Sequence, residues 1–308
     1  MHFVRAMVFA LLFLLPAAAS AQWLKQANAQ YKKGEYNKAI PLYKKAVAKG
    51  ENPTMSYFNM GNTYFQLSKL PLAIVYYRAA VDHAPDFFPG HLNLAVAYYM
   101  LEDMGKTIAT LKRALELKPK HLKTNMMLAS SYRRAGALPQ AATLFERIYE
   151  TYPEKHKVCL SLGEIYRELD DPVEATKWLL RYPTSGKYRV HVLQMLAEIH
   201  ESGGAQNKAI YYLRQVCEAD PKKRWSRYQL VLLLRRSGHG LVALAEAEKA
   251  LELHKGFTEL ALLAGNMAFA EKLYARAEQH YLRAKKLGSP GAVIGLENIR
   301  VIRENRAR

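Results

Sequence analysis

Cysteine is scarce in this 308-residue chain, which contains only Cys159 and Cys217. Two cysteines cannot build the disulfide framework of a small secreted domain or a four-cysteine zinc site. A disulfide between them would require Cα atoms within about 7 Å of each other. Because the two residues fall on non-equivalent helices, we predict two separate buried thiols, with one disulfide as the alternative.

Recognisable catalytic motifs are also lacking. The sequence contains no G-x-S-x-G, no Walker phosphate loop, no H-E-x-x-H and no C-x-x-C. The ten histidines are scattered, without a pair at metal-ligand spacing on one helix face. The acidic pair Asp170-Asp171 falls at an expected turn, where a solvated pair is commoner than an acid/base pair. We therefore predict a non-enzymatic protein that needs no cofactor and no metal.

Acidic residues are few relative to basic ones. There are 27 Asp and Glu against 45 Lys and Arg, which gives a formal net charge of +18. Such an excess favours an anionic partner or surface but says nothing about the fold. Hydrophobic residues make up 50% and charged residues 23% of the chain, which excludes wholesale disorder.

Long apolar runs are limited to one segment at the N-terminus. Arg5 precedes an unbroken apolar run from Ala6 to Leu15, Pro16 ends it, and small residues lead up to Ala21. This layout is typical of a secretory signal peptide, and we predict residues 1–21 as a leader cleaved after Ala21. An uncleaved anchor is the alternative, but the run has about half of the roughly 20 residues that a spanning helix needs. The mature chain is expected to have no transmembrane span and to be exported. We expect its destination to be a bacterial periplasm, with secretion from the cell as the alternative.

The remainder of the chain contains an internal repeat of 34 residues. Three residue types recur at this interval. Proline stands at Pro85, Pro119 and Pro153, and tyrosine stands at Tyr64, Tyr98, Tyr132 and Tyr166. Nine residues after each of these tyrosines stands a small residue, at Ala73, Thr107, Ala141 and Ala175. A fixed period of this length is typical of proteins built from stacked supersecondary units. Strand patterns bounded by Asn-Gly or Asp-Gly turns do not occur. We therefore predict an all-α repeat protein rather than two globular domains.

The repeat resembles the tetratricopeptide repeat (TPR) family, whose unit reads W-x2-L-G-x2-Y, then A-x3-F/Y, A and a closing Pro. The second unit carries this pattern most fully, at Tyr57, Met60-Gly61, Tyr64, Ala73, Tyr77, Ala80 and Pro85. The resemblance implies a TPR α-solenoid, a right-handed superhelix of antiparallel helix pairs. We place eight units in residues 22–290, at about 20–53, 54–87, 88–121, 122–155, 156–189, 190–223, 224–257 and 258–290.

A solenoid needs a polar cap at its open end, because its last unit would otherwise expose an apolar face. Residues 291–308 are predicted to form this capping helix, since an otherwise polar segment carries one apolar stripe at Ala292, Leu296, Ile299 and Ile302. A helix lying on a membrane surface is the alternative.

The fifth unit departs from the pattern. Pro183 arrives early, so we expect a second helix cut to about Val173–Tyr182 and a longer loop at 183–187. This loop could act as a hinge between units one to five and units six to eight, or it could be a local variation.

In TPR proteins the first helices of successive units line a concave groove that holds extended peptides or partner segments. The resemblance assigns to the groove of units one to three a set of amide and aromatic side chains: Asn28, Tyr31, Phe58, Asn59, Asn62, Phe65, Asn93 and Tyr99. Amides can both donate to and accept from a peptide backbone, and aromatic rings offer contact area at low entropy cost. We expect a partner-binding scaffold of the cell envelope that holds protein segments here.

Groove positions of the later units are more basic. Arginines at these positions are Arg133, Arg134, Arg167, Arg235 and Arg236, interrupted by glutamates. One interpretation is a cationic half-groove for an anionic envelope polymer or peptidoglycan, and the other is an ordinary solvated charged face. Nucleic acid would suit the charge, but an exported protein rarely meets it and no base-stacking module is present, so no nucleic-acid partner is expected.

Overall fold

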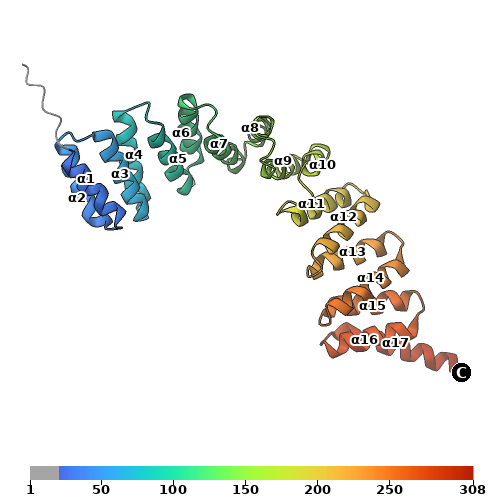
Figure 1. Ribbon diagram of the computed structural model, residues 1–308. Coiled ribbons are helices and arrows are strands. Elements are labelled where there is room, and N and C mark those ends of the chain that lie inside the picture. The colour runs from blue at the N-terminus through green and yellow to red at the C-terminus, as the bar shows by residue number, and fades with distance from the viewer. Residues whose placement is uncertain (1–20, 308) are drawn as a thin grey trace, which may run out of the picture. The chain divides into compact units, whose positions relative to one another are not determined.

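The computed structural model describes residues 21–307, and every regular element in that range is an α-helix (Figure 1). The all-α TPR fold class predicted from the sequence is confirmed. The leader predicted over residues 1–21 lies, apart from Ala21, outside the described residues. Within the described part, no helix is both long and apolar enough to cross a bilayer.

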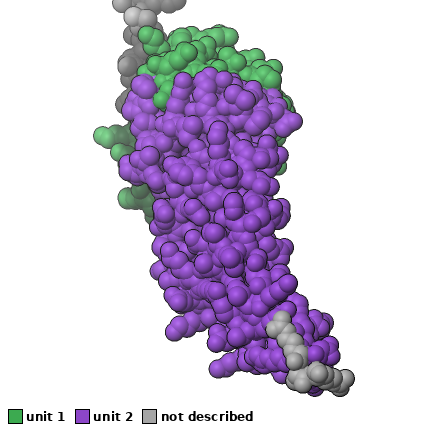
Figure 2. Space-filling view, turned by 90° about the vertical axis from the view of Figure 1, so that its right-hand side faces the viewer, with its two compact units in different colours: residues 1–151 green, residues 152–308 purple. Residues whose placement is uncertain are grey.

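The helices divide between two compact units, which Figure 2 distinguishes by colour. Unit 1 extends to Thr151 and unit 2 begins at Tyr152. Unit 1 contains α1 (Gln22–Lys32), α2 (Tyr36–Ala48), α3 (Pro53–Gln66), α4 (Leu70–His83), α5 (Phe88–Met100), α6 (Met104–Leu117), α7 (Leu122–Arg134) and α8 (Leu138–Thr151). Unit 2 contains α9 (Lys157–Glu168), α10 (Pro172–Leu180), α11 (Arg189–Ser202), α12 (Gln206–Ala219), α13 (Arg224–Arg236), α14 (Gly240–Leu253), α15 (Thr258–Ala270), α16 (Tyr274–Lys286) and α17 (Pro290–Ala307).

Within each unit the helices form successive pairs, because a small residue on the first helix admits a large one from the second. In the pair α3/α4, Gly61 lies against the ring of Tyr77, and a Cβ atom on Gly61 would come within 2.5 Å of Tyr77 Cδ1. Gly265 and Tyr281 repeat this contact in α15/α16, where the added Cβ would lie 2.6 Å from the ring. Both tyrosines are buried. The alternation of large and small residues seen in the sequence is therefore the packing rule of the core.

A left-handed residue ends the first helix of every pair from α1/α2 to α15/α16. Eight residues spaced by 34 share this conformation: Gly34, Ser68, Glu102, Gly136, Asp170, Gly204, Gly238 and Lys272. The following residue donates its N–H back across the turn, as in Glu35 N–H to Gln30 O at 3.0 Å, which is the Schellman arrangement. Four of the eight are not glycine and hold a positive φ at a steric cost.

The second helix of the fifth pair is short, as the sequence predicts. Helix α10 has 9 residues, whereas α12 and α14 have 14 each. The following segment is held by internal hydrogen bonds, including Tyr188 N–H to Tyr182 Oη at 3.0 Å and Arg189 N–H to Gly186 O at 2.9 Å. The division between the two units lies between residues 151 and 152 rather than at this loop. The role of the 183–187 loop as a hinge stays a prediction.

Helix α17 caps the last pair, as predicted. Ala292 and Ile299 are buried, and Gly295 lies so close to Tyr281 that a Cβ atom there would come within 2.4 Å of the ring. Arg303 Nη1 donates to Glu278 Oε1 of α16 at 2.9 Å, which ties the end of the cap to the pair beneath it. The helix therefore covers the apolar face that α15 and α16 would otherwise expose.

Candidate partner-binding face

The amide and aromatic residues predicted for the groove lie on the first helices α1, α3 and α5 of unit 1, and all eight are half-buried. We call these eight residues the amide–aromatic face: Asn28, Tyr31, Phe58, Asn59, Asn62, Phe65, Asn93 and Tyr99.

The asparagines of this face form two identical hydrogen-bonded groups. Oδ1 of Asn28 accepts from Tyr43 Oη at 2.7 Å and from Asn59 Nδ2 at 2.9 Å. One pair further on, Oδ1 of Asn62 accepts from Tyr77 Oη at 2.8 Å and from Asn93 Nδ2 at 2.8 Å. Each group therefore joins the two helices of one pair and links them to the first helix of the next.

These bonds divide the amide atoms into two classes. The carbonyl oxygens of Asn28 and Asn62 satisfy buried phenols, and burial raises the pKa of both Tyr43 and Tyr77, so the phenols stay protonated donors. The amide groups still available to a ligand are Nδ2 of Asn28 and Asn62, which can donate, and Oδ1 of Asn59 and Asn93, which can accept. The face thus retains donors and acceptors alternating along the direction in which the pairs stack.

The sequence analysis did not predict that the side-chain carbonyls of Asn28 and Asn62 bond buried tyrosines, although a pattern in the sequence indicates it. Tyrosine occupies this position of the second helix only where an asparagine stands 15 residues earlier: Tyr43 with Asn28, Tyr77 with Asn62, and Tyr281 with Asn266. The other pairs have Leu111, Phe145, Leu179, Leu213 and Ala247 at the equivalent position. A buried hydroxyl requires a partner and an apolar side chain does not, which is why the two residues occur together.

Two aromatic members of the face, Phe58 and Tyr31, pack against neighbouring rings. The ring of Phe58 lies 5.2 Å from that of Phe87 in an edge contact and 5.9 Å from that of Tyr77. The Tyr31 ring lies 5.4 Å from the Tyr36 ring. Such pairs hold rings in place before a ligand arrives, so contact with a partner would immobilise few side chains.

Most of the predicted basic positions are paired with carboxylates. Arg134, which also stacks on Tyr99, donates to Glu102 at 2.8 Å, and Arg236 bonds Glu201. Arg133 is half-buried and Arg235 is exposed. Exposed ion pairs contribute about 0–1 kcal/mol to stability, but they neutralise the charge locally. Arg133 and Arg134 belong to unit 1, whereas the other three arginines belong to unit 2.

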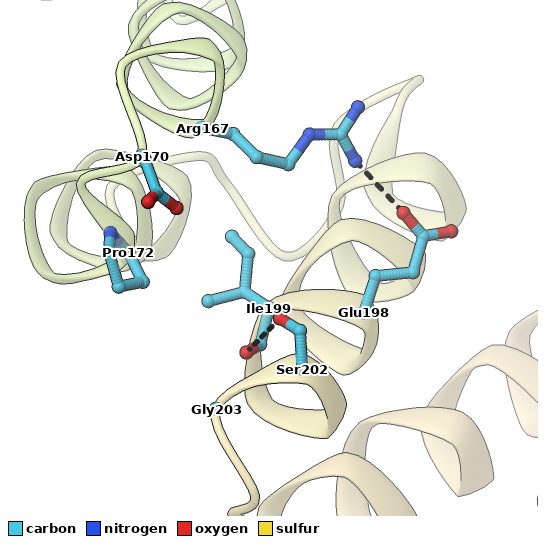
Figure 3. A pocket seen from close by; sticks show the side chains of 7 residues that line it. All are labelled: Arg167, Asp170, Pro172, Glu198, Ile199, Ser202 and Gly203. Atoms are coloured by element: carbon cyan, nitrogen blue, oxygen red, sulfur yellow. Dashed lines mark hydrogen bonds and ion pairs between the residues drawn. The ribbon is translucent and has the colours of Figure 1, made fainter.

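Arg167 lines a pocket between the ends of α9 and α11, drawn in Figure 3. Its Nη1 donates to Glu198 Oε2 at 2.9 Å, and Ser202 Oγ donates to the carbonyl oxygen of Ile199 at 3.0 Å. The pocket has a volume of about 430 Å³. Because Arg167 is already paired with Glu198 and Asp170 adds a second carboxylate to the lining, the pocket does not form an anion site.

Both cysteine side chains are buried. Burial raises the pKa of the Cys217 thiol to about 11, which keeps it protonated and unreactive at neutral pH. Cys159 is also buried, on α9. Within residues 21–307 no three His, Cys, Asp or Glu side chains are grouped so that they could hold a metal ion.

Comparison with known families assigns tetratricopeptide repeat models to residues 22–54, 55–87, 89–121, 126–189, 190–223 and 228–292. No curated protein matches the sequence significantly.

Several solved structures share the fold at low sequence identity. A tetratricopeptide repeat protein from Parabacteroides merdae is 16% identical over 80% of this chain and 99% of its own, with a TM-score of 0.52. Naa15/Naa10 bound to HypK-THB is 17% identical over 92% of this chain and 44% of that one, with a TM-score of 0.63. YrrB, described as a TPR protein with an unusual peptide-binding site, is 13% identical over 61% of this chain and 96% of its own, with a TM-score of 0.52.

The matched segments cover most of the chain, and the helix pairs, their 34-residue interval and the solved structures all agree with them. This chain belongs to the tetratricopeptide repeat proteins, a family of helical protein-interaction scaffolds.

Proposed function

We propose that this protein is a non-enzymatic scaffold that holds an extended segment of a partner protein on the amide–aromatic face of unit 1. The observation that carries the proposal is the recurrence of Asn59 and Asn93 at equivalent positions of α3 and α5, each with Nδ2 bonded to an asparagine of the preceding pair and with Oδ1 available. An extended peptide presents its N–H and C=O groups at regular intervals, and a series of amides at a regular interval can pair with them.

The test separates binding from folding. Asn59→Ala and Asn93→Ala leave the carbonyls of Asn28 and Asn62 in place, so Tyr43 and Tyr77 keep their acceptors. Peptides selected from a random library by the wild-type protein should lose at least tenfold in affinity for the double variant. Asn207→Ala, at an exposed asparagine of α12, is the matched control and should bind as wild type. Unchanged affinity of the double variant would contradict the proposal.

We also propose that the chain is exported and works in a bacterial periplasm. The support is the layout of residues 1–21 in the sequence. Expression of the full chain in a bacterium, followed by fractionation and N-terminal sequencing, should yield a periplasmic product that begins at Gln22. A cytoplasmic product with an intact N-terminus would refute export.

The competing idea of an anionic polymer as the ligand predicts a different salt dependence. Polymer binding should weaken steeply between low and high salt, whereas peptide binding at amides should change little. Titration with poly-glutamate at two salt concentrations distinguishes them. The pairing of Arg134, Arg167 and Arg236 with carboxylates leads us to expect weak binding of the polymer.

A further inference from the structure

A second candidate site lies in unit 2, on the side of α11 opposite the face that carries Glu198 and Glu201. The pocket has a volume of about 210 Å³. Its α11 wall consists of Arg189, Val192, Leu193 and Leu196, which recur at the spacing of one helix face.

The pocket arises because α10 ends early. Helix α10 stops at Leu180, about one turn and a half short of α12 and α14. The missing turn would otherwise cover part of α11 and α12. In its place the chain turns away through Pro183 and Thr184, which form one wall of the pocket.

The loop wall is built in advance of any ligand. Tyr182 Oη accepts the N–H of Tyr188 at 3.0 Å, and a Cβ atom on Gly186 would come within 2.3 Å of the Tyr182 ring. Arg189 Nη1 donates to the Thr184 carbonyl oxygen at 2.6 Å. These contacts fix the loop against the start of α11, so the pocket does not have to be formed on binding.

The size and lining of the pocket select the class of occupant. Leu179, Val192, Leu193 and Leu196 are buried apolar side chains, and Tyr211 and Tyr212 add aromatic walls. Pockets for drug-sized molecules measure roughly 300–1,000 Å³, whereas an apolar cavity of about 150 Å³ holds a single benzene. A pocket of about 210 Å³ therefore fits one large apolar side chain.

The rim carries an exposed leucine, Leu180, at a position where six of the other pairs have a charged residue. Leu180 is 58% exposed, and the residues at its position elsewhere are Lys44, Arg78, Lys112, Glu146, Arg214 and Glu248, with Leu282 the one other leucine. Tyr211 is 60% exposed. Exposed apolar residues gathered around an apolar pocket indicate a docking surface.

The mouth of the pocket carries an uncompensated positive charge. Arg189 bonds only neutral oxygens, the Thr184 carbonyl and Gln215 Oε1 at 3.4 Å, among the described residues. The residues that line the pocket include no Asp or Glu. An acidic group on a ligand would therefore meet a guanidinium that has no carboxylate partner, unlike those of Arg134, Arg167 and Arg236.

We propose that this pocket takes one large apolar side chain of a partner protein, with an acidic residue next to it in the partner's sequence pairing with Arg189. The site lies apart from the amide–aromatic face and goes beyond the function proposed for that face. A partner segment could therefore be held by unit 2 independently of unit 1.

The test uses the whole chain with methyl-labelled leucine and valine and two-dimensional NMR. The probe is the capped dipeptide acetyl-phenylalanyl-aspartyl amide at millimolar concentration. It should shift the methyl signals of Leu179, Leu193 and Leu196. The lysyl analogue should bind at least fivefold more weakly, and acetyl-glycyl-aspartyl amide should leave these methyls unshifted.

Matched variants assign the two parts of the site. Arg189→Gln should reduce the preference for the aspartyl over the lysyl dipeptide to below twofold, while Arg214→Gln, an exposed arginine of α12, should leave it unchanged. Leu180→Glu should weaken binding at least fivefold, and Leu282→Glu, at the equivalent exposed position (52% exposed), should not. Asn59→Ala should have no effect, which separates this site from the amide–aromatic face.

Three results would overturn the proposal. The first is the absence of shifts at the pocket methyls, and the second is equal affinity of the aspartyl and lysyl dipeptides for the wild-type protein. The third is a change of the pocket methyls with protein concentration alone, which would identify a second copy of the chain as the occupant.

Discussion

Tyr281 Oη donates a hydrogen bond to Oδ1 of Asn266 at 2.9 Å, across the pair α15/α16. Tyr281 is 3% exposed, so its hydroxyl depends on this one acceptor. The same link joins Tyr43 to Asn28 and Tyr77 to Asn62. Three asparagines of the first helices, none of them buried, therefore supply the acceptors for tyrosines of the core.

Removing the acceptor should destabilise the last pair. Asn266→Ala leaves a buried hydroxyl unsatisfied, which costs about 1–3 kcal/mol. The double variant Asn266→Ala/Tyr281→Phe removes both partners and should recover most of the loss. Hydrogen exchange of the α15 and α16 amides measures the local opening free energy. Equal exchange in the single and double variants would contradict the assigned role.

A methyl group on Gly61 should also destabilise the protein. Gly61→Ala places Cβ 2.5 Å from Tyr77 Cδ1, and overpacking of about 1–3 kcal/mol exceeds the roughly 0.5–1 kcal/mol gained from replacing a helical glycine. The added change Tyr77→Leu should restore the melting temperature, because the next pair has Ala95 and Leu111 at these positions. Gly105→Ala, at an exposed glycine of α6, is the control and should raise it.

Replacing a non-glycine residue of positive φ by glycine, at the turn between the two helices of a pair, should stabilise the protein. Lys272 holds φ at 60° between α15 and α16, a conformation that costs a non-glycine residue roughly 1–2 kcal/mol. Lys272→Gly should therefore stabilise unit 2 by about 1 kcal/mol and raise its melting temperature. Gly238→Ala, at the equivalent turn with φ of 80°, should have the opposite effect. A lower melting temperature for Lys272→Gly would contradict this account.

One histidine should make the stability of unit 2 depend on pH. His200 lies where four of the other pairs have tyrosine and stacks on Tyr212, with ring centroids 5.5 Å apart. Burial, with a smaller contribution from Lys208, lowers the pKa of His200 below its ordinary value.

As the pH falls, the unfolded chain binds a proton at His200 before the folded chain does, at about pH 6.5. The contribution of neutral, buried His200 to the free energy of unfolding is therefore complete above that pH. It is lost as the pH falls towards the folded pKa. His200→Tyr should flatten the melting temperature between pH 7.5 and 5.5, where the wild type should fall. The control is His239, an exposed histidine before α14, whose replacement by Tyr should leave the pH dependence unchanged.

The fold class could be predicted from residue order alone, because large and small residues that alternate at a 34-residue interval are typical of stacked helix pairs. Gly61 opposite Tyr77 shows the reason: the steric rule acts between residues close in the chain and repeats without reference to distant parts. The shortened α10 followed equally from one local event, the early Pro183. These features depend on backbone sterics and short-range packing, which sequence spacing expresses directly.

Only the packed helices show which polar atoms of the site already have a hydrogen-bond partner and which are available to a ligand. Asn28 and Asn59 looked alike in the sequence, yet the oxygen of the first accepts two hydrogen bonds while that of the second remains available. Arg167 donates to the carboxylate of Glu198 on the neighbouring helix α11, whereas Arg189 donates to the backbone carbonyl of Thr184. A hydrogen bond between two helices forms only where donor and acceptor lie about 2.7–3.2 Å apart. Residue order specifies which helices stack, but only their packing in space sets those distances.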